Sequence, residues 1–244
     1  MCGRFTSITS ATDIANFFAV DEPEEQLPRS WNVAPTQKVL TLFELADPEP
    51  EKVLAAKRWG LLPPWAKDES MASKLINARS ETVAEKPSFR SAIKKRRCLV
   101  PISGYYEWIV VEGQKKNQPI YFSDRENRPI VLAGIYEKWT HPQSQQLFET
   151  FSILTTAANK MIEPLHDRMP VMLEEKDWDR WLDPTLTDPS QLVDLYQSRP
   201  WDNLQYWPVT TEMNSPRFNS PECIAPIDFP LTNSADDLGQ QRLL

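Results

Sequence analysis

Residues 98–111 read CLVPISGYYEWIVV, and this stretch decides the fold class. Val, Ile, Tyr and Trp make up more than half of it, a composition typical of β-strands. Similar runs precede and follow it, and polar turns such as 114–117 separate those that follow. The other predicted strands are 38–45, 53–59, 119–123, 129–139, 147–156, 168–173, 206–210 and 222–227. We therefore expect a curved, barrel-like and mainly antiparallel β core.

The predicted helices are short and flank this core. Ser10 can cap the first, over 10–18, which carries an apolar stripe. The others are 78–85, 88–95, 159–164, 174–182 and 189–199. Residues 229–244 are polar and lack periodicity, which predicts a flexible C-terminal tail. The sequence therefore indicates an α+β protein with a single domain over 1–228.

Composition excludes several classes of protein. Of 244 residues, 41% are hydrophobic and 25% charged, as in ordinary soluble proteins. The chain has no run of 18 apolar residues and no basic leader followed by an apolar stretch, so we expect neither a membrane span nor a secretory signal. Three widely spaced cysteines and two histidines argue against a disulfide framework and against a zinc site. We expect a cytoplasmic protein, nucleoid-associated if bacterial, that needs no metal and no cofactor.

Charge is distributed unevenly along the chain. The formal net charge is −7, which argues against nucleic-acid binding over the whole surface. Residues 57–128, however, carry 15 basic and 8 acidic side chains, with a dense basic run over 94–97. That run is typical of a solvated helix end, but a basic face on an acidic protein also permits local DNA binding. The sequence leaves both interpretations open.

Cys2 is the most informative residue. The small side chain after Met1 favours removal of the methionine, which would leave a free amine and a thiol on one residue, with ordinary pKa values near ~8 and ~8.5. Such a 1,2-aminothiol condenses with an aldehyde to an imine, and the thiol then closes a thiazolidine ring. The same group could be the nucleophile of an N-terminal amidohydrolase, or simply a small apolar residue at a frayed end. Arg4, a bidentate phosphate donor, lies two residues away.

Three further polar clusters interrupt apolar segments. Asn77 and Arg79 point the same way if their segment is extended, although Asn77 could instead cap a helix. Glu107 lies among aromatic residues, where burial would raise its pKa and suit it to acid–base chemistry; a surface position on an edge strand is the alternative. His166 can move protons near neutral pH, or it is an ordinary loop histidine.

Aromatic residues and prolines gather in two irregular segments, 31–35 and 59–65. Exposed rings stack on unpaired bases, and apolar wedges separate base steps. A place in the hydrophobic core is the alternative for the tryptophans. No single cluster decides the function, but their joint occurrence does.

Taken together, these motifs resemble the SRAP family (SOS-response-associated peptidase domain), the abasic-site processing proteins. The matching segments run in the family's order and are 1–5 (MCGRF), 32–36 (NVAPT), 59–60 (WG), 76–82 (INARSET), 97–101 (RCLVP), 104–108 (GYYEW), 155–159 (TTAAN) and 166–170 (HDRMP). Members of the family recognise abasic sites in single-stranded DNA and trap the ring-opened deoxyribose as a thiazolidine. The resemblance implies the same activity here: a covalent DNA–protein crosslink through Cys2 that shields the lesion during replication or repair.

The resemblance also implies a role for individual residues. Cys2 would be the nucleophile, Asn77 would orient the reacting groups, and Glu107 and His166 would transfer protons. The residues implied in DNA binding are Arg4, Pro35, Trp65, Arg79, Thr155 and Arg168. The implied partner is single-stranded DNA that contains abasic sites, and we expect the protein to be a monomer.

Two positions depart from the family pattern. Ser103 stands where the family usually has Asp before the glycine of the GYYEW-like motif. We expect this departure to affect a turn or a contact that supports the site. Ala66 stands where some members carry a second aromatic residue of the stacking platform. Two other functions stay open: an N-terminal-cysteine peptidase that processes itself, and a non-covalent reader of single-stranded or modified DNA. A lyase step through the imine is also open.

Overall fold

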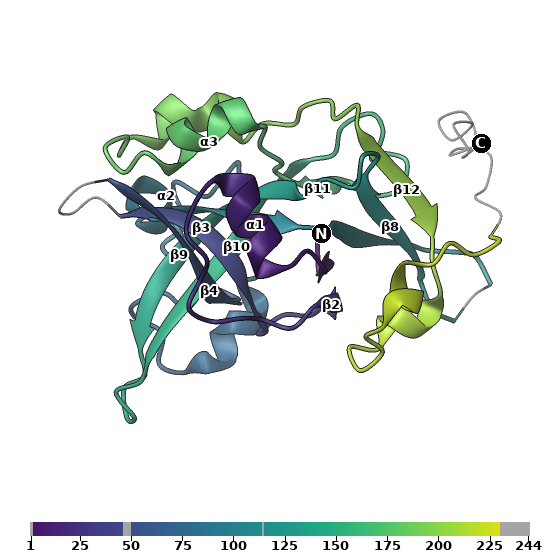
Figure 1. Cartoon of the computed structure of the whole chain (residues 1–244), viewed down its shortest axis with the longest axis horizontal. Helices are drawn as coiled ribbons and strands as arrows, with labels where there is room; N and C mark the ends of the chain where they lie inside the picture. Colours follow the sequence, from purple (N-terminus) through teal and green to yellow (C-terminus); the bar gives the residue numbers. More distant parts are fainter. Residues whose placement is uncertain (1, 46–49, 114, 230–244) are drawn as a thin grey trace.

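The computed structural model describes residues 2–45, 50–113 and 115–229, and it arranges them as two β-sheets with short helices around them (Figure 1). The strands are β1 (Arg4–Ser7), β2 (Ser30–Val33), β3 (Lys38–Leu45), β4 (Glu51–Trp59), β5 (Asn77–Arg79), β6 (Arg97–Ile102), β7 (Gly104–Ile109), β8 (Gln118–Asp124), β9 (Ile130–Thr140), β10 (Leu147–Ala157), β11 (Arg168–Pro170) and β12 (Leu204–Pro208). The helices are α1 (Ala11–Phe18), α2 (Ala92–Lys95) and α3 (Glu175–Leu182), with 3-10 turns η1 (Glu69–Lys74), η2 (Pro189–Leu195), η3 (Thr211–Asn214) and η4 (Pro221–Ile224).

Five strands close into a barrel. In the order β4, β3, β6, β9 and β10 each strand is hydrogen-bonded to the next, and β10 returns to β4. Strand β10 runs parallel to β4 and β5, whereas the other pairs are antiparallel. The far end of β10 continues past the barrel wall, where 153–155 pair with β5 and 155–157 pair with β11. The predicted α+β fold with a curved, mainly antiparallel core is confirmed.

The second sheet is joined to the barrel by one uninterrupted run of chain. Its order is β12, β8, β7, β1, β2, and all its pairs are antiparallel. Strand β7 follows the barrel strand β6 after a single residue, Ser103, so the strand predicted over 98–111 is divided between the two sheets. Gly104 allows this close crossing, because a Cβ there would lie 2.3 Å from Tyr121 Oη and 2.4 Å from the carbonyl oxygen of Phe122.

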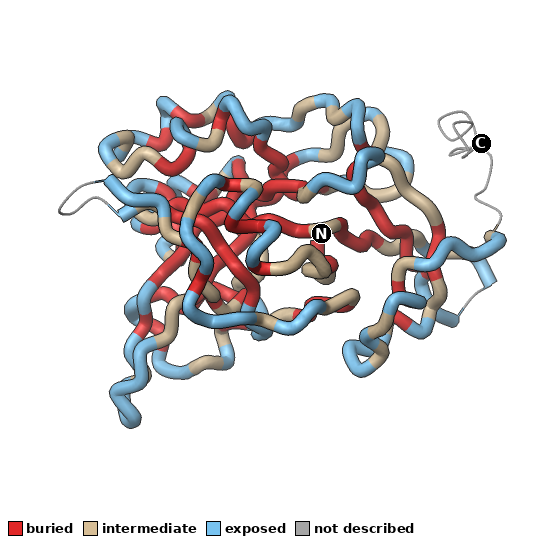
Figure 2. The backbone as a smooth tube through the Cα atoms, viewed as in Figure 1, coloured by how far each residue is buried: buried red, intermediate tan, exposed pale blue. Residues whose placement is uncertain are grey.

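Four clusters of buried hydrophobic residues lie in the described part of the chain, and three of them join the layers. The first fills the barrel and continues against the second sheet; its members include Val39, Trp59, Cys98, Phe5, Tyr105 and Phe122. The second packs α1 and α3 against the outside of the barrel, and the third lies under η3 and η4 on the other face of the second sheet. Figure 2 shows that the buried segments are mainly the strands that cross the centre of the molecule.

The first predicted helix is confirmed together with its cap. Ser10 Oγ accepts a hydrogen bond from the backbone N–H of Asp13 at 3.1 Å, and the helix ends at Ala19, which is left-handed with φ of 53°. In the described part of the chain, no helix is both long and apolar enough to cross a bilayer.

Several predicted boundaries are wrong. Residues 78–85 form no helix: β5 opens this segment because its backbone pairs with β10, and turns follow. The predicted helix over 88–95 shortens to α2. The strand predicted over 222–227 is the 3-10 turn η4 and a single bridge from Pro226 to Val209. Strands β1 and β2 were not predicted. The predicted tail lies outside the described residues except for residue 229.

Candidate active site and nucleic-acid interface

Cys2 lies where the two sheets meet, just before β1. Its side chain is fully buried, and its Sγ is 3.9 Å from the carbonyl oxygen of Arg4. Asn77, the first residue of β5, donates from Nδ2 to the carbonyl oxygen of Cys2 at 2.8 Å, so a strand beside the barrel holds the start of the second sheet. Burial, and next the charge of Glu107, raise the pKa of the Cys2 thiol far above its usual range. The thiol is therefore neutral and needs a base before it can react.

Glu107 and His166 face each other beside Cys2. Glu107, on β7, is 1% exposed, and its Oε2 lies 3.7 Å from Nε2 of His166. His166 ends the run of turns before β11, where its backbone N–H donates to Ile162 at 2.9 Å. Burial raises the pKa of Glu107 to about 7, and burial lowers the pKa of His166. Glu107 therefore titrates close to neutral pH, and His166 is favoured in its neutral form beside it, an arrangement that suits proton transfer.

The ring of His166 has partners on both nitrogens. Its Nδ1 can accept from the backbone N–H of Arg168 at 2.9 Å or donate to the Arg168 carbonyl oxygen at 3.1 Å, and in the first arrangement the neutral ring carries its proton on Nε2, toward Glu107. In the protonated ring, Nδ1–H would face Asp167 Oδ1, which is 3.1 Å away. Each protonation state has a partner, as a group that accepts and releases protons requires.

Arg4 is bound to the protein over much of its guanidinium. Its Nη1 donates to Asn32 Oδ1 at 2.7 Å, and its two Nη atoms reach the carbonyl oxygens of Met213 and Asn214 at 3.4 and 3.3 Å. Asn32 is 1% exposed and donates to further carbonyls of residues 213–218. The contacts of Arg4 thus join β1 to η3, and only part of its donor set remains for a phosphate.

A second group of predicted site residues surrounds the far end of β10. Thr155 pairs with Arg79 of β5, and its carbonyl oxygen accepts from Arg168 Nη2 at 2.7 Å. Arg168 also binds Glu81 through Nη1 at 2.6 Å and Nη2 at 2.9 Å, and this pairing lowers the pKa of Glu81. Arg79 is exposed, whereas Thr155 has no exposed surface. Glu81 therefore occupies the two Nη atoms with which Arg168 was expected to bind a phosphate.

Pro35 and Trp65 lie in turns at the ends of strands. The Trp65 side chain is 53% exposed and available for stacking, whereas Trp59 is fully buried and belongs to the core. Pro35 is half-buried and precedes Thr36, whose φ of 76° is left-handed. The N–H of Thr36 donates to the carbonyl oxygen of Trp59 at 2.8 Å, which ties the Pro35 turn to the segment that leads to Trp65.

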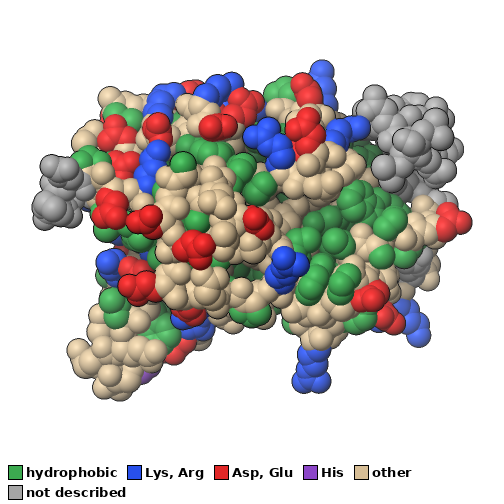
Figure 3. Space-filling view, viewed as in Figure 1, with side chains coloured by type: hydrophobic (Ala, Val, Ile, Leu, Met, Phe, Trp, Pro, Cys, Tyr) green, Lys and Arg blue, Asp and Glu red, His purple; other side chains and the backbone are tan. Residues whose placement is uncertain are grey.

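One face of the molecule carries an apolar area. Figure 3 shows hydrophobic side chains gathered between the regions of β2 and β8 in the same view as Figure 1, with charged side chains around the area. An apolar surface with cationic neighbours is the combination that single-stranded nucleic acids require, because bases stack on it and phosphates meet the charges.

The last two residues of the dense basic run over 94–97 bind other parts of the protein. Arg97 is 3% exposed and donates to the carbonyl oxygens of Ile93 at 2.8 Å and of Lys94 at 3.0 Å, and it also reaches carbonyls at the end of α3. Arg96 forms an ion pair with Glu137. Lys94 and Lys95 are exposed in the last turn of α2, so the run does lie at a helix end.

The two departures from the family pattern have clear surroundings. Ser103 Oγ accepts from the backbone N–H groups of Ile8 at 3.1 Å and Thr9 at 3.3 Å, which is the task that an Asp carboxylate could perform there. Ala66 is buried, and its carbonyl oxygen accepts from Trp139 Nε1 at 2.9 Å, so its side chain is not part of an exposed platform.

Three supporting residues were not given a role from the sequence: Asn32, Glu81 and Asp167. Each lies inside a segment that was singled out, and Glu81 and Asp167 are close in sequence to a predicted cation or acid–base group, whereas Asn32 is not. Their partners, however, come from segments distant in the sequence or from a local turn, so only the fold shows what they hold.

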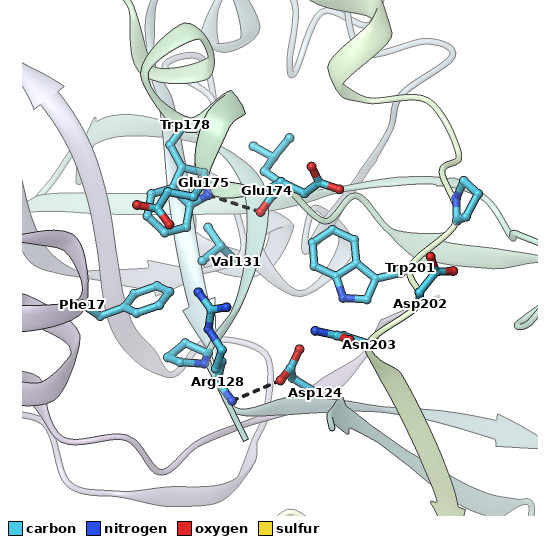
Figure 4. Close-up of a pocket in the computed structure, with 13 residues that line it drawn as sticks. Phe17, Asp124, Arg128, Val131, Glu174, Glu175, Trp178, Trp201, Asp202 and Asn203 are labelled. Carbon is cyan, nitrogen blue, oxygen red and sulfur yellow. Dashed lines mark hydrogen bonds between the residues drawn. The ribbon is translucent and has the colours of Figure 1, made fainter. Parts of the chain in front are cut away.

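A surface pocket of about 400 Å³ lies elsewhere, between α1, the start of α3 and the turn from β8 to β9 (Figure 4). Phe17, Trp178 and Trp201 form its apolar walls, and none of the predicted site residues lines it. Within the three described ranges, no cluster of His, Cys, Asp and Glu is arranged to hold a metal ion.

The fold agrees with comparisons to known proteins. The model of the family described as "SOS response associated peptidase (SRAP)" matches residues 1–216, and the chain belongs to this family. A solved structure of a protein from Bacteroides thetaiotaomicron has a TM-score of 0.80 with 26% identity, over 93% of this chain and 100% of that one.

Two named relatives extend the similarity. The abasic site processing protein YoqW of Bacillus subtilis is 41% identical over 226 residues, which cover 92% of this chain and 99% of YoqW. The abasic site processing protein HMCES of Rattus norvegicus is 33% identical over 243 residues, which cover 85% of this chain and 67% of HMCES.

Proposed function

We propose that this protein processes abasic sites in single-stranded DNA by forming a covalent thiazolidine with the deoxyribose through Cys2. The relatives in Bacillus subtilis and Rattus norvegicus are both named abasic site processing proteins, which supports an abasic site as the substrate. The observation that carries the chemistry is the meeting of a buried thiol with Glu107, whose pKa is raised to about 7 and whose carboxylate faces His166. A neutral thiol needs a base, and a departing hydroxyl needs an acid; Glu107 can be both in turn.

The proposed reaction balances without a cofactor. Removal of Met1 leaves an α-amine on Cys2, and this amine adds to the aldehyde carbon of the ring-opened sugar to give a carbinolamine. Glu107 protonates the hydroxyl, which leaves as water, and an iminium forms. The Glu107 carboxylate then takes the thiol proton while sulfur bonds to the iminium carbon. The thiazolidine is closed, one water has been released, and Glu107 is an acid again.

The other site residues have supporting roles in this proposal. Asn77 holds the carbonyl of Cys2, which orients the amine and the thiol toward the same side. His166 keeps a proton on Nε2 for Glu107 and can assist sugar ring opening. Arg79 and Arg168 bind phosphates, and Arg168 does so after Glu81 is displaced. Pro35 and Trp65 contact the bases that flank the lesion.

Intact mass spectrometry tests the proposal directly. The protein is mixed with a single-stranded oligonucleotide that carries one abasic site, and we expect a species at the sum of both masses less Met1 and less one water. Two controls should give no adduct: Cys2→Ala, and an oligonucleotide whose abasic site is a tetrahydrofuran, which cannot open to an aldehyde. Cys223→Ser removes another buried free thiol and should crosslink normally.

The alternative functions predict different results in mass spectrometry and in binding measurements. A protein that loses more than Met1 from its N-terminus would favour a peptidase. Equal binding of abasic and intact strands without any adduct would favour a non-covalent reader. An undiminished adduct with Cys2→Ala would contradict the mechanism.

A further inference from the structure

Tyr105 has a buried hydroxyl close to Cys2 that finds no hydrogen-bond partner among the described residues. Its side chain is fully buried, and its Oη makes no hydrogen bond with any described residue. A buried polar atom of this kind is rare, because most find a partner, and leaving one without a partner destabilises the folded protein. The ring itself is firmly held, stacked on Phe122 with the centroids 4.7 Å apart and the planes 6° from parallel.

The neighbours of Tyr105 are the residues of the candidate active site. Alternate residues of a strand share a face, so Tyr105 and Glu107 lie on the same side of β7. Tyr105 belongs to the same hydrophobic core as Cys2. After burial, the charges of Glu107 and of Cys2 are what raise the pKa of the Tyr105 hydroxyl, so all three groups lie within electrostatic reach of one another.

A second buried atom without a partner adjoins the same residue. Asn77 uses Nδ2 on the carbonyl of Cys2, and its Oδ1 is buried and accepts no hydrogen bond from the described part of the chain. A phenol that can donate and an amide oxygen that can accept thus both border Cys2. They form a polar lining that the described residues do not satisfy.

We infer that the Tyr105 hydroxyl donates a hydrogen bond to the sugar oxygen on the carbon that Cys2 attacks. This inference rests on the function proposed above and assigns a further substrate contact in it. The oxygen is first the aldehyde oxygen, then the carbinolamine hydroxyl, and finally the departing water. Tyr105 polarises the aldehyde and holds the leaving oxygen within reach of Glu107.

Tyr105 keeps its own proton throughout. Its raised pKa makes the phenol a poor acid, so the proton that departs with water still comes from Glu107. Removing the hydroxyl should therefore lower the crosslinking rate at every pH without moving the pH limbs that Glu107 sets. This distinguishes a hydrogen-bond donor from a group that transfers a proton.

The experiment compares Tyr105→Phe with Tyr106→Phe. Tyr106 is the adjacent residue on the opposite face of β7, and its Oη donates to the carbonyl oxygen of Trp31 at 2.6 Å. We measure the single-turnover rate of crosslinking to an abasic oligonucleotide at saturation, its pH profile, and the melting temperature of each protein. Tyr105→Phe should react about tenfold or more slowly while melting no lower than wild type, because the lost hydroxyl had no partner.

Tyr106→Phe should show the opposite pattern, with a lower melting temperature and the wild-type rate. If wild type crosslinks and Tyr105→Phe crosslinks equally fast, the inference is overturned and the proposed function stands. If wild type itself forms no adduct after loss of Met1, the proposed function fails and the inference fails with it. A Tyr105→Phe protein that loses rate only in proportion to lost folding would also overturn the inference.

Discussion

Among single residues, Glu107 has the ionisation that matters most for the site. Its carboxyl is 1% exposed, and burial raises its pKa to about 7. A group whose pKa is raised on folding favours the folded state most at low pH, below the ordinary value of 4.5, and this contribution is lost as the pH rises through about 7. The group that enables proton transfer therefore destabilises the protein at alkaline pH.

Glu107→Gln separates these two effects. The amide cannot ionise, so the variant should gain stability relative to wild type as the pH rises from 5 to 8, by up to about 3 kcal/mol. Urea denaturation at the two pH values measures this difference. The same variant should crosslink slowly, and its rate should lack the limb near pH 7 that wild type shows. A stability difference that stays constant with pH would contradict the assignment.

The sequence could identify site residues but not their present partners. Cys2, Asn77, Glu107 and His166 each lie in a short motif, and polar residues within apolar segments are visible in one dimension. The Glu81 carboxylate on Arg168 joins residues 87 positions apart, and no local pattern shows that it fills the expected phosphate position. Thr155 was expected to contact DNA, yet it is fully buried because strands flank it on both sides.

At the level of elements, the corner between β6 and β7 positions the reactive end of the chain. Ser103 is the only residue between the two strands, and its Oγ accepts from two backbone N–H groups just after β1. The backbone N–H of Ser103 also donates to Thr6, within β1, at 2.9 Å. The corner therefore holds the strand that follows Cys2.

Ser103→Ala should loosen this strand. Two buried or half-buried N–H groups lose their acceptor, which should lower the free energy of unfolding by about 1–2 kcal/mol. Hydrogen exchange of the β1 amides should become faster than in wild type, and those of β9 should change less. Ser103→Asp restores an acceptor and should recover most of the stability. If the Ala and Asp variants behave alike, the hydrogen bonds at this corner do not stabilise β1.

Elements with a strong periodic signal were predictable, and those that depend on distant pairing were not. The cap at Ser10 and the apolar stripe of α1 are local, so this helix was predicted correctly. β1 and β5 are only four and three residues long, and each is a strand because a distant neighbour offers its backbone. The short turn-rich stretch after Asn77 has helical propensity, but pairing with β10 overrides it.

For the molecule as a whole, the barrel interior contains a charge. The Lys57 side chain has no exposed surface, and its Nζ is 2.9 Å from Glu149 and 3.6 Å from the ring centroid of Phe43. Tyr136 contributes a second ring at 4.7 Å. Glu149, which is partly exposed, also pairs with Lys138 at 3.2 Å. The buried Lys57 ammonium thus pairs with the Glu149 carboxylate, whereas Glu149 also pairs with a second cation, Lys138.

This asymmetry predicts unequal effects of two substitutions. Lys57→Met fills the barrel with an apolar side chain and leaves Glu149 paired with Lys138, so the free energy of unfolding should change by less than about 1 kcal/mol. Glu149→Gln leaves the buried ammonium without its anion and should destabilise by about 2 kcal/mol or more. Chemical denaturation of both variants tests this order. A larger loss for Lys57→Met would mean that the cation, rather than its volume, holds the barrel together.

The place of β1 in the second sheet has a mechanical consequence for the proposed crosslink. β1 is not an edge strand: β7 lies on one side of it and β2 on the other, and Arg4 binds across to η3. A nucleic acid attached at residue 2 and pulled by a translocating machine would transmit its tension into an interior strand of a five-stranded sheet. Two ladders of hydrogen bonds must separate before the load reaches the rest of the chain, so the anchor resists extraction far better than a frayed terminus would.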